Sequence, residues 1–187
     1  MIRFILAALA IATLPAVAEE ASWVGDARKV ASAMPPKLLG VLTEEIQKGG
    51  PESAVAVCRD KAPQMAKAAS EQSGWAIRRV SLRNRNPKAV PDAWERTVLE
   101  EFDRRAAAGE AAPTLEKSEV VADGDNKVQR YMKALPTQEV CLSCHGAADN
   151  LSAAVSEQLR KLYPDDKAVG YKPGEIRGAI TLKRAAQ

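Results

Sequence analysis

Residues 115–135 read LEKSEVVADGDNKVQRYMKAL, with the turn-forming run Asp123-Gly124-Asp125-Asn126 between two segments that favour strands. Such a connection is typical of a β-hairpin, because these residues tolerate the backbone conformations of a tight reversal. We therefore predict antiparallel strands over 115–121 and 128–135. The chain accordingly contains an antiparallel sheet.

Two more strands are predicted outside this hairpin. Residues 75–82 are rich in strand-forming residues, and the polar loop 83–87 that follows them favours a turn. Near the end of the chain, residues 176–182 are expected to close the sheet as its last strand.

Helices dominate the first half of the predicted fold. A helix is expected over 27–46, with an interruption at Pro35-Pro36 and an end at Gly49-Gly50. Pro51 then starts a second helix, because proline is favoured in a first turn. Pro63 lies inside this second helix and predicts a kink just after Cys58. The apolar residues on one face of the second helix are Ala54, Cys58, Ala62, Met65 and Ala69.

Two later helices complete the expected secondary structure, at 91–108 and 151–162. Helices first and mostly antiparallel strands later predict an α+β domain, in which helices pack against one sheet. A length of 187 residues suits one domain with a substantial core.

The first 18 residues, MIRFILAALAIATLPAVA, have a basic start, an apolar run and a small-residue ending. This pattern predicts a secretory signal peptide at 1–18, cleaved after Ala18, because the apolar run is only about half of the roughly 20 residues that a membrane-spanning helix needs. We therefore expect one domain at 19–187 in the periplasm, with no stable membrane anchor. The formal net charge of +3 lacks the strong, clustered basicity of nucleic-acid-binding proteins.

The residues with the most distinctive chemistry are Cys141-Leu142-Ser143-Cys144-His145, a C-x-x-C-H sequence. This spacing is typical of c-type haem attachment. Two thiols form thioethers with the two vinyl groups of one porphyrin, and the adjacent imidazole binds the iron. We predict one covalent haem c, held by Cys141 and Cys144, with His145 as an iron ligand.

Zinc binding and dithiol redox chemistry are the alternatives for these cysteines. Zinc would take Cys58 as its fourth ligand, but structural zinc sites usually bring their ligands as two close pairs, and Cys58 stands alone in sequence. A thiol oxidoreductase normally places its C-x-x-C at the start of a helix that follows a strand, and that pattern is missing here. Haem attachment is therefore the favoured interpretation.

The second iron ligand has several candidates from the residues alone. Bis-histidine ligation is excluded, because His145 is the only histidine. A buried cysteine or methionine ordinarily serves core packing, whereas export favours ligation of an otherwise unpaired thiol. The candidates are Cys58, Met65, Met132, a lysine or an open site, with Met34 weaker because it adjoins Pro35-Pro36.

The charged residues near the predicted sheet say less about function than the cysteines and the histidine do. Any single arginine of the strand and loop at 75–87 is more commonly solvated than bound to a haem propionate. Asp165 and Asp166 predict a turn rather than an acid/base pair. With the only histidine on iron, no nucleophile and base can be assembled, so we expect no enzyme. The candidate propionate partners are Arg78, Arg79, Arg83 and Arg85.

Four segments stand out in combination and in order: AVAVCRDKAP at 54–63, RRVSLRNRNPKAVPDAWE at 78–95, CLSCHG at 141–146 and YPDDKAVGYKPGEIRGAI at 163–180. Together they resemble a family of small exported c-type haem proteins, which also occur as periplasmic haem sensor modules of histidine kinases.

The resemblance implies a PAS-like α+β domain, with an antiparallel sheet and with N-terminal and flanking helices around the haem. It makes His145 the proximal ligand and Cys58 the ligand on the other side of the iron. It also implies redox or ligand sensing through the haem, with a sensor partner. If reduction of the iron releases Cys58, a small gas is a candidate ligand at the site that becomes open. The alternative is an electron-transfer cytochrome, passing single electrons between periplasmic redox partner proteins.

Overall fold

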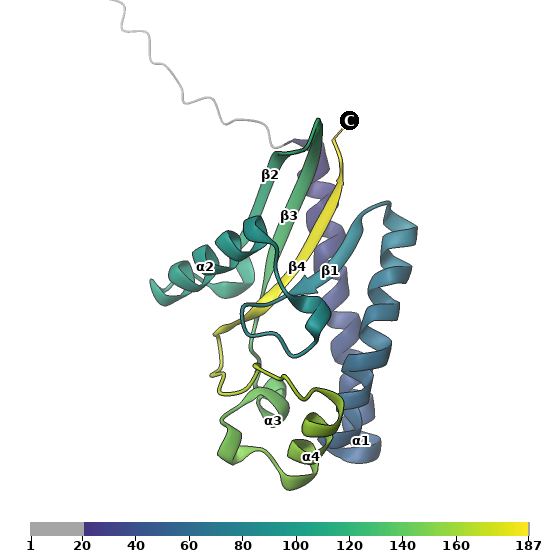
Figure 1. Ribbon diagram of the computed structural model, residues 1–187, viewed down its shortest axis with the longest axis vertical. Helices are drawn as coiled ribbons and strands as arrows, with labels where there is room; N and C mark the ends of the chain where they lie inside the picture. The colour runs from purple at the N-terminus through teal and green to yellow at the C-terminus, as the bar shows by residue number, and fades with distance from the viewer. Residues whose placement is uncertain (1–20, 187) are drawn as a thin grey trace, which may run out of the picture.

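A computed structural model describes residues 21–186. Helices cover both faces of a twisted sheet, and a small helical region lies beyond one end of that sheet (Figure 1). The signal peptide predicted at 1–18 falls outside the described residues. Within the described part of the chain, no helix combines the length and the apolar character needed to cross a bilayer.

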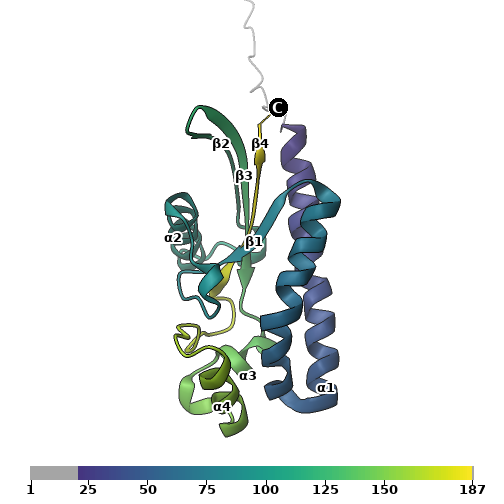
Figure 2. The same cartoon turned by 45° about the vertical axis from the view of Figure 1, so that its right-hand side comes forward.

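The first element, α1 (Ser22–Ser73), folds back on itself as two antiparallel arms (Figure 2). Gly50 makes the turn with φ 76° and ψ 171°, outside the helical region, as the two glycines predict. The predicted break at Pro35-Pro36 is wrong, because α1 runs through it. Both prolines can adopt the helical φ, and the packing of Ala27 and Ala31 against the sheet compensates for the lost hydrogen bonds. Only Gly50 leaves helical angles in α1, so Pro63 does not interrupt it.

The four strands form one antiparallel sheet in the order β1-β4-β3-β2, which confirms the predicted α+β fold class. Strand β4 is last in sequence but lies between β1 and β3 rather than at an edge. Gly178 of β4 has φ 146°, and a Cβ there would lie 2.3 Å from the Val80 carbonyl oxygen of β1. The strand bounds are β1 Ala76–Val80, β2 Glu116–Asp123, β3 Asn126–Pro136 and β4 Ile176–Ala185.

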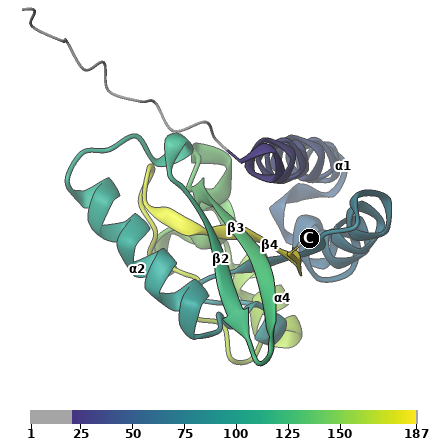
Figure 3. The ribbon, with the colours of Figure 1, turned by 90° about the horizontal axis from the view of Figure 1, so that it is seen from above.

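Alternate side chains of the sheet enter two separate cores. Tyr131 of β3 packs toward the first arm of α1, while its neighbour Met132 packs toward α2 (Ala93–Ala107) on the other face. Seen from above, the sheet lies between α1 and α2 (Figure 3). Asp92 and Glu95 form a capping box that starts α2.

The two short helices α3 (Leu142–His145) and α4 (Ala153–Leu162) lie beyond the end of the sheet, beside the turn of α1 (Figures 1 and 2). A small core joins Val55 of α1 to Val155, Leu159 and Tyr163 of the last helix and its end. This core attaches the region to the second arm of α1. Its helices are α3 Leu142–His145 and α4 Ala153–Leu162, and the short 3-10 turns of the chain are Pro87–Ala89, Ala112–Thr114, Glu139–Cys141 and Ala148–Asn150.

Candidate cofactor site

The C-x-x-C-H sequence forms a 3-10 turn that ends at Cys141, followed by the single helical turn α3. Residues three and four apart are neighbours on a helical turn, so Cys141 lies beside both Cys144 and His145. Gly146 ends the turn, with its amide donating to the Leu142 carbonyl at 2.9 Å. A Cβ at Gly146 would lie 2.7 Å from that carbonyl oxygen, so only glycine fits this close end. The motif therefore places two thiols and an imidazole within one short helical turn.

The imidazole of His145 is held by a backbone carbonyl. Its Nδ1 lies 2.7 Å from the Ala168 oxygen, and a carbonyl oxygen only accepts hydrogen bonds, so Nδ1 carries the proton. Nε2 is then left with a free lone pair. Burial, reinforced by the positive charges of Arg177 and Arg85, holds the pKa of His145 well below its ordinary value. The ring is therefore neutral near pH 7, in the tautomer that binds a metal through Nε2.

Cys58 lies on the second arm of α1 and borders the same region. Burial raises the pKa of its thiol, against the opposing effects of Arg79, Arg85 and Arg177, the three arginines that also act on His145. One turn earlier, Val55 packs in the same small core as Cys144.

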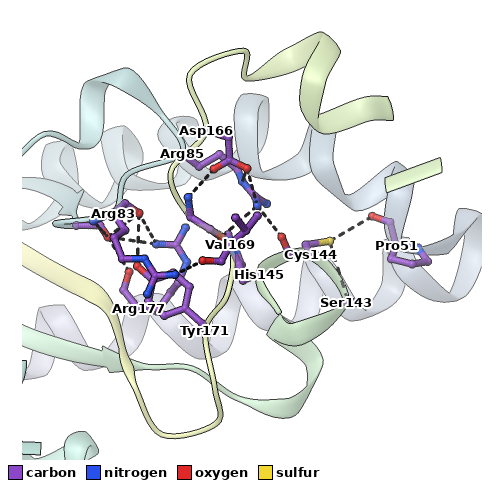
Figure 4. Close-up of polar contacts among 12 residues, drawn as sticks. Pro51, Arg83, Arg85, Ser143, Cys144, His145, Asp166, Val169, Tyr171 and Arg177 are labelled. Carbon is purple, nitrogen blue, oxygen red and sulfur yellow. Dashed lines mark hydrogen bonds and ion pairs between the residues drawn. The ribbon is translucent and has the colours of Figure 1, made fainter. Parts of the chain in front are cut away.

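A direct contact supports this placement: the Cys144 Sγ lies 3.8 Å from the carbonyl oxygen of Pro51, at the start of the same arm (Figure 4). The structure thus brings Cys58 close to the motif, although 83 residues separate it from Cys141 in sequence.

Arg85 holds the motif from the side of the sheet. Its guanidinium pairs with Asp166 at 2.9 Å and donates to the carbonyl oxygens of Cys144, at 2.6 Å, and Ala168, at 3.3 Å (Figure 4). Only 7% of the Arg85 side chain and 11% of the Asp166 side chain are exposed, so this is a buried ion pair. The predicted turn at Asp165 and Asp166 thus also supplies the carboxylate that fixes Arg85.

The other three arginines named from the sequence do not all lie on the same side of the sheet. Arg78 points to the α2 face and pairs with the buried Glu95, away from Cys58 and His145. Arg83 donates to the Val169 carbonyl. Arg79 lies on the same face of β1 as Ile77, whose side chain packs toward α1. Three of the four candidates, Arg79, Arg83 and Arg85, therefore lie on the side of the motif.

Two residues of the site were not singled out from the sequence. The Tyr171 ring stands edge-on to His145, with centroids 6.3 Å apart and an interplanar angle of 89°. The guanidinium carbons of Arg83 and Arg177 lie 3.9 Å and 5.1 Å from the Tyr171 centroid (Figure 4). Both residues belong to the segment at 163–180, which the family resemblance had marked without assigning them a role.

The methionine candidates for an iron ligand lie in different surroundings. Met132 is fully buried in the core under α2, and Met34 packs beside the core that contains Trp75. Core packing accounts for both. Met65 is half-buried on the same arm of α1 as Cys58, two turns further along.

The alternative of a zinc site finds no matching geometry. Among residues 21–186, no group of three or more His, Cys, Asp or Glu side chains is placed to hold a metal ion. Cys58, Cys141 and Cys144 are free thiols. The three cysteines and His145 therefore border one region without forming a compact tetrahedral set.

Comparison with known proteins gives one family and one solved structure. The family model described as Tll0287-like matches residues 8–184. The crystal structure of the cyanobacterial haem protein Tll0287 superposes with a TM-score of 0.67, covering 90% of this chain and 98% of that chain at 23% sequence identity, which shows a shared fold. A search of curated proteins found no match. Because the family model covers nearly the whole sequence, the chain belongs to the Tll0287-like family.

Proposed function

We propose that this chain is a periplasmic c-type haem protein that senses redox state or a small ligand through one haem bound by His145 and Cys58. The observation that carries the proposal is the orientation of His145. Its Nδ1 is committed to the Ala168 carbonyl, which leaves Nε2 with a free lone pair on the same short turn that carries the two motif thiols. A further support is that the structural neighbour Tll0287 is described as a haem protein.

The residues present fit the group. Cys141 and Cys144 are free thiols that share one side of a helical turn, as thioether attachment to a single porphyrin requires. His145 supplies a neutral imidazole, and Cys58 supplies a soft sulfur donor from a second element. When bound, the haem would provide an iron that exchanges one electron and can take a small gas as ligand.

Cys58 determines the character of the iron in this proposal. Burial favours its neutral thiol, but Arg79, Arg85 and Arg177 oppose that effect and favour the thiolate that a metal requires. A thiolate ligand stabilises ferric over ferrous iron, so a low reduction potential follows. Reduction would weaken the bond to Cys58 and leave His145 as the retained ligand.

Sensing is favoured by where the two ligands lie. His145 belongs to the segment between β3 and β4, whereas Cys58 belongs to α1, whose first arm packs on the sheet. Binding both would join the second arm of α1 to α3 through the iron. Release of Cys58 would free that arm, and a partner protein could read the change.

The test is visible and EPR spectroscopy of the protein matured in cells that attach haem c. Wild type, Cys58→Ala and, as the matched control on the same helix arm, Met65→Leu are compared in both oxidation states, with and without CO. The proposal expects a thiolate-type ferric spectrum that Cys58→Ala loses and Met65→Leu keeps, and CO binding only after reduction.

Other outcomes would contradict the proposal. An unchanged spectrum in Cys58→Ala would remove Cys58 as a ligand. If Cys58 stayed bound in both oxidation states without CO binding, the switch would fail and electron transfer would be the better function.

A further inference from the structure

Four arginines surround the region between Cys58 and the motif: Arg79, Arg83, Arg85 and Arg177, here called the arginine cluster. Arg85 has a carboxylate partner, Asp166. None of the other three makes an ion pair with a carboxylate within the part of the chain that the structure describes. Buried or half-buried guanidinium groups without a counter-ion are costly, which indicates that an anionic group is bound there.

Arg177 shows most directly that a guanidinium group in the arginine cluster lacks hydrogen-bond acceptors. Its side chain is only 5% exposed, and its Nε is a buried donor without a hydrogen-bond partner. Its Nη1 reaches only the Ser81 hydroxyl, at 3.3 Å, and the Arg83 carbonyl, at 3.5 Å. The Tyr171 ring lies beneath the guanidinium, as for Arg83. The guanidinium is therefore held by neutral hydrogen-bond acceptors and an aromatic ring, its Nε donor is unused, and the charge of Asp166 acts on it without forming an ion pair.

Arg79 contributes from the neighbouring strand. It is half-buried on the face of β1 that looks toward α1, and it has no hydrogen-bonding partner among the described residues. Burial lowers the pKa of the Arg79 guanidinium, and the ionisable groups of Cys58, Cys141 and Tyr171 oppose that effect. Arg79 thus borders the same region from the side of Cys58.

We propose that Arg79 and Arg177 bind the two propionates of the haem and act as positioning residues for it. This inference rests on the proposed function. A haem brings two carboxylates, one for each of these two guanidinium groups, which form no ion pair with a carboxylate among the described residues. Arginine suits carboxylates because its planar fork donates two parallel hydrogen bonds.

The test is the midpoint potential of haem-loaded Arg79→Gln and Arg177→Gln, with Arg104→Gln as control because Arg104 is exposed on α2. Removing one positive charge from a partly desolvated site should lower the ratio of ferrous to ferric protein at a fixed applied potential by about tenfold. Arg177→Lys and Arg79→Lys keep the charge and should restore most of that ratio.

A second experiment distinguishes an effect of the propionates on the potential from an effect of the Cys58 thiolate. Arg79→Gln is also measured in the Cys58→Ala background, where the shift should persist, because the propionates remain. A shift that vanishes there would assign Arg79 to the thiolate and overturn the proposal. The proposal would also be overturned if Arg79→Gln and Arg177→Gln had the same midpoint potential as Arg104→Gln. If Arg177→Gln does not fold, the potential of Arg79→Gln alone decides. Wild-type protein without covalent haem would instead refute the proposed function itself.

Discussion

Replacing Arg85 by methionine should destabilise the protein strongly, because Arg85 is the main polar tie between the sheet and the motif. The change removes a buried ion pair with Asp166 and the donors to the Cys144 and Ala168 carbonyls. It leaves the Asp166 carboxylate, whose side chain is 11% exposed, without its charged partner. Breaking a buried pair from one side costs about 3–5 kcal/mol, and in a chain of this length that corresponds to a fall in Tm of about 6–20 °C.

The assay is urea unfolding of wild type, Arg85→Met, Asp166→Leu and the double variant. Removing both partners leaves no unpaired charge, so the double variant should lose less free energy of unfolding than the sum of the single variants, by about 1–3 kcal/mol. Arg104→Met is the control for loss of an exposed arginine and should change stability by less than about 0.5 kcal/mol. A loss below about 1 kcal/mol in Arg85→Met, or additive effects of the two single substitutions, would show that Arg85 and Asp166 do not form a stabilising buried pair.

Three further predictions concern the sheet and its two cores. Gly178→Ala should lower the free energy of unfolding by about 2 kcal/mol or more, because the added Cβ would lie 2.3 Å from the Val80 carbonyl oxygen and the backbone φ is 146°. A thermal melt like that of wild type would contradict this. Met132→Leu should cost less than about 1.5 kcal/mol and leave the haem spectrum unchanged, whereas a changed spectrum would make Met132 a ligand. The Arg28 hydrogen bond to Glu116 lowers the pKa of that carboxyl below its ordinary 4.5, so its stabilising effect is present above that pH and is lost as pH falls through the lowered pKa. The stability difference between wild type and Glu116→Gln should therefore shrink below pH 4.5, and a constant or growing difference in urea unfolding would contradict this sign.

Local patterns in the sequence predicted most elements of this fold. The turn residues at 123–126, between two segments that favour strands, predicted the β2–β3 hairpin, and the glycines at 49–50 predicted the turn of α1. The Pro35-Pro36 pair was misleading because a local rule omits the packing of α1 on the sheet. The central position of β4 could not be predicted either, since strand order depends on contacts between distant segments.

The candidate site was predictable where its chemistry is local in sequence. C-x-x-C-H is such a pattern, whereas Cys58 needed the family resemblance, because nothing near it in sequence links it to the motif. The Ala168 carbonyl, Tyr171 and Arg177 could not be found from residue types, since a backbone acceptor and a buried arginine acquire their roles only through the fold.

The most direct measurement is the intact mass of denatured protein from cells that attach haem c, taken after extraction with acidic acetone. We expect a polypeptide that stays coloured and is heavier by one haem, and a Cys141→Ser/Cys144→Ser variant that has neither property. A colourless wild-type polypeptide with the mass of the amino-acid chain alone would contradict this expectation.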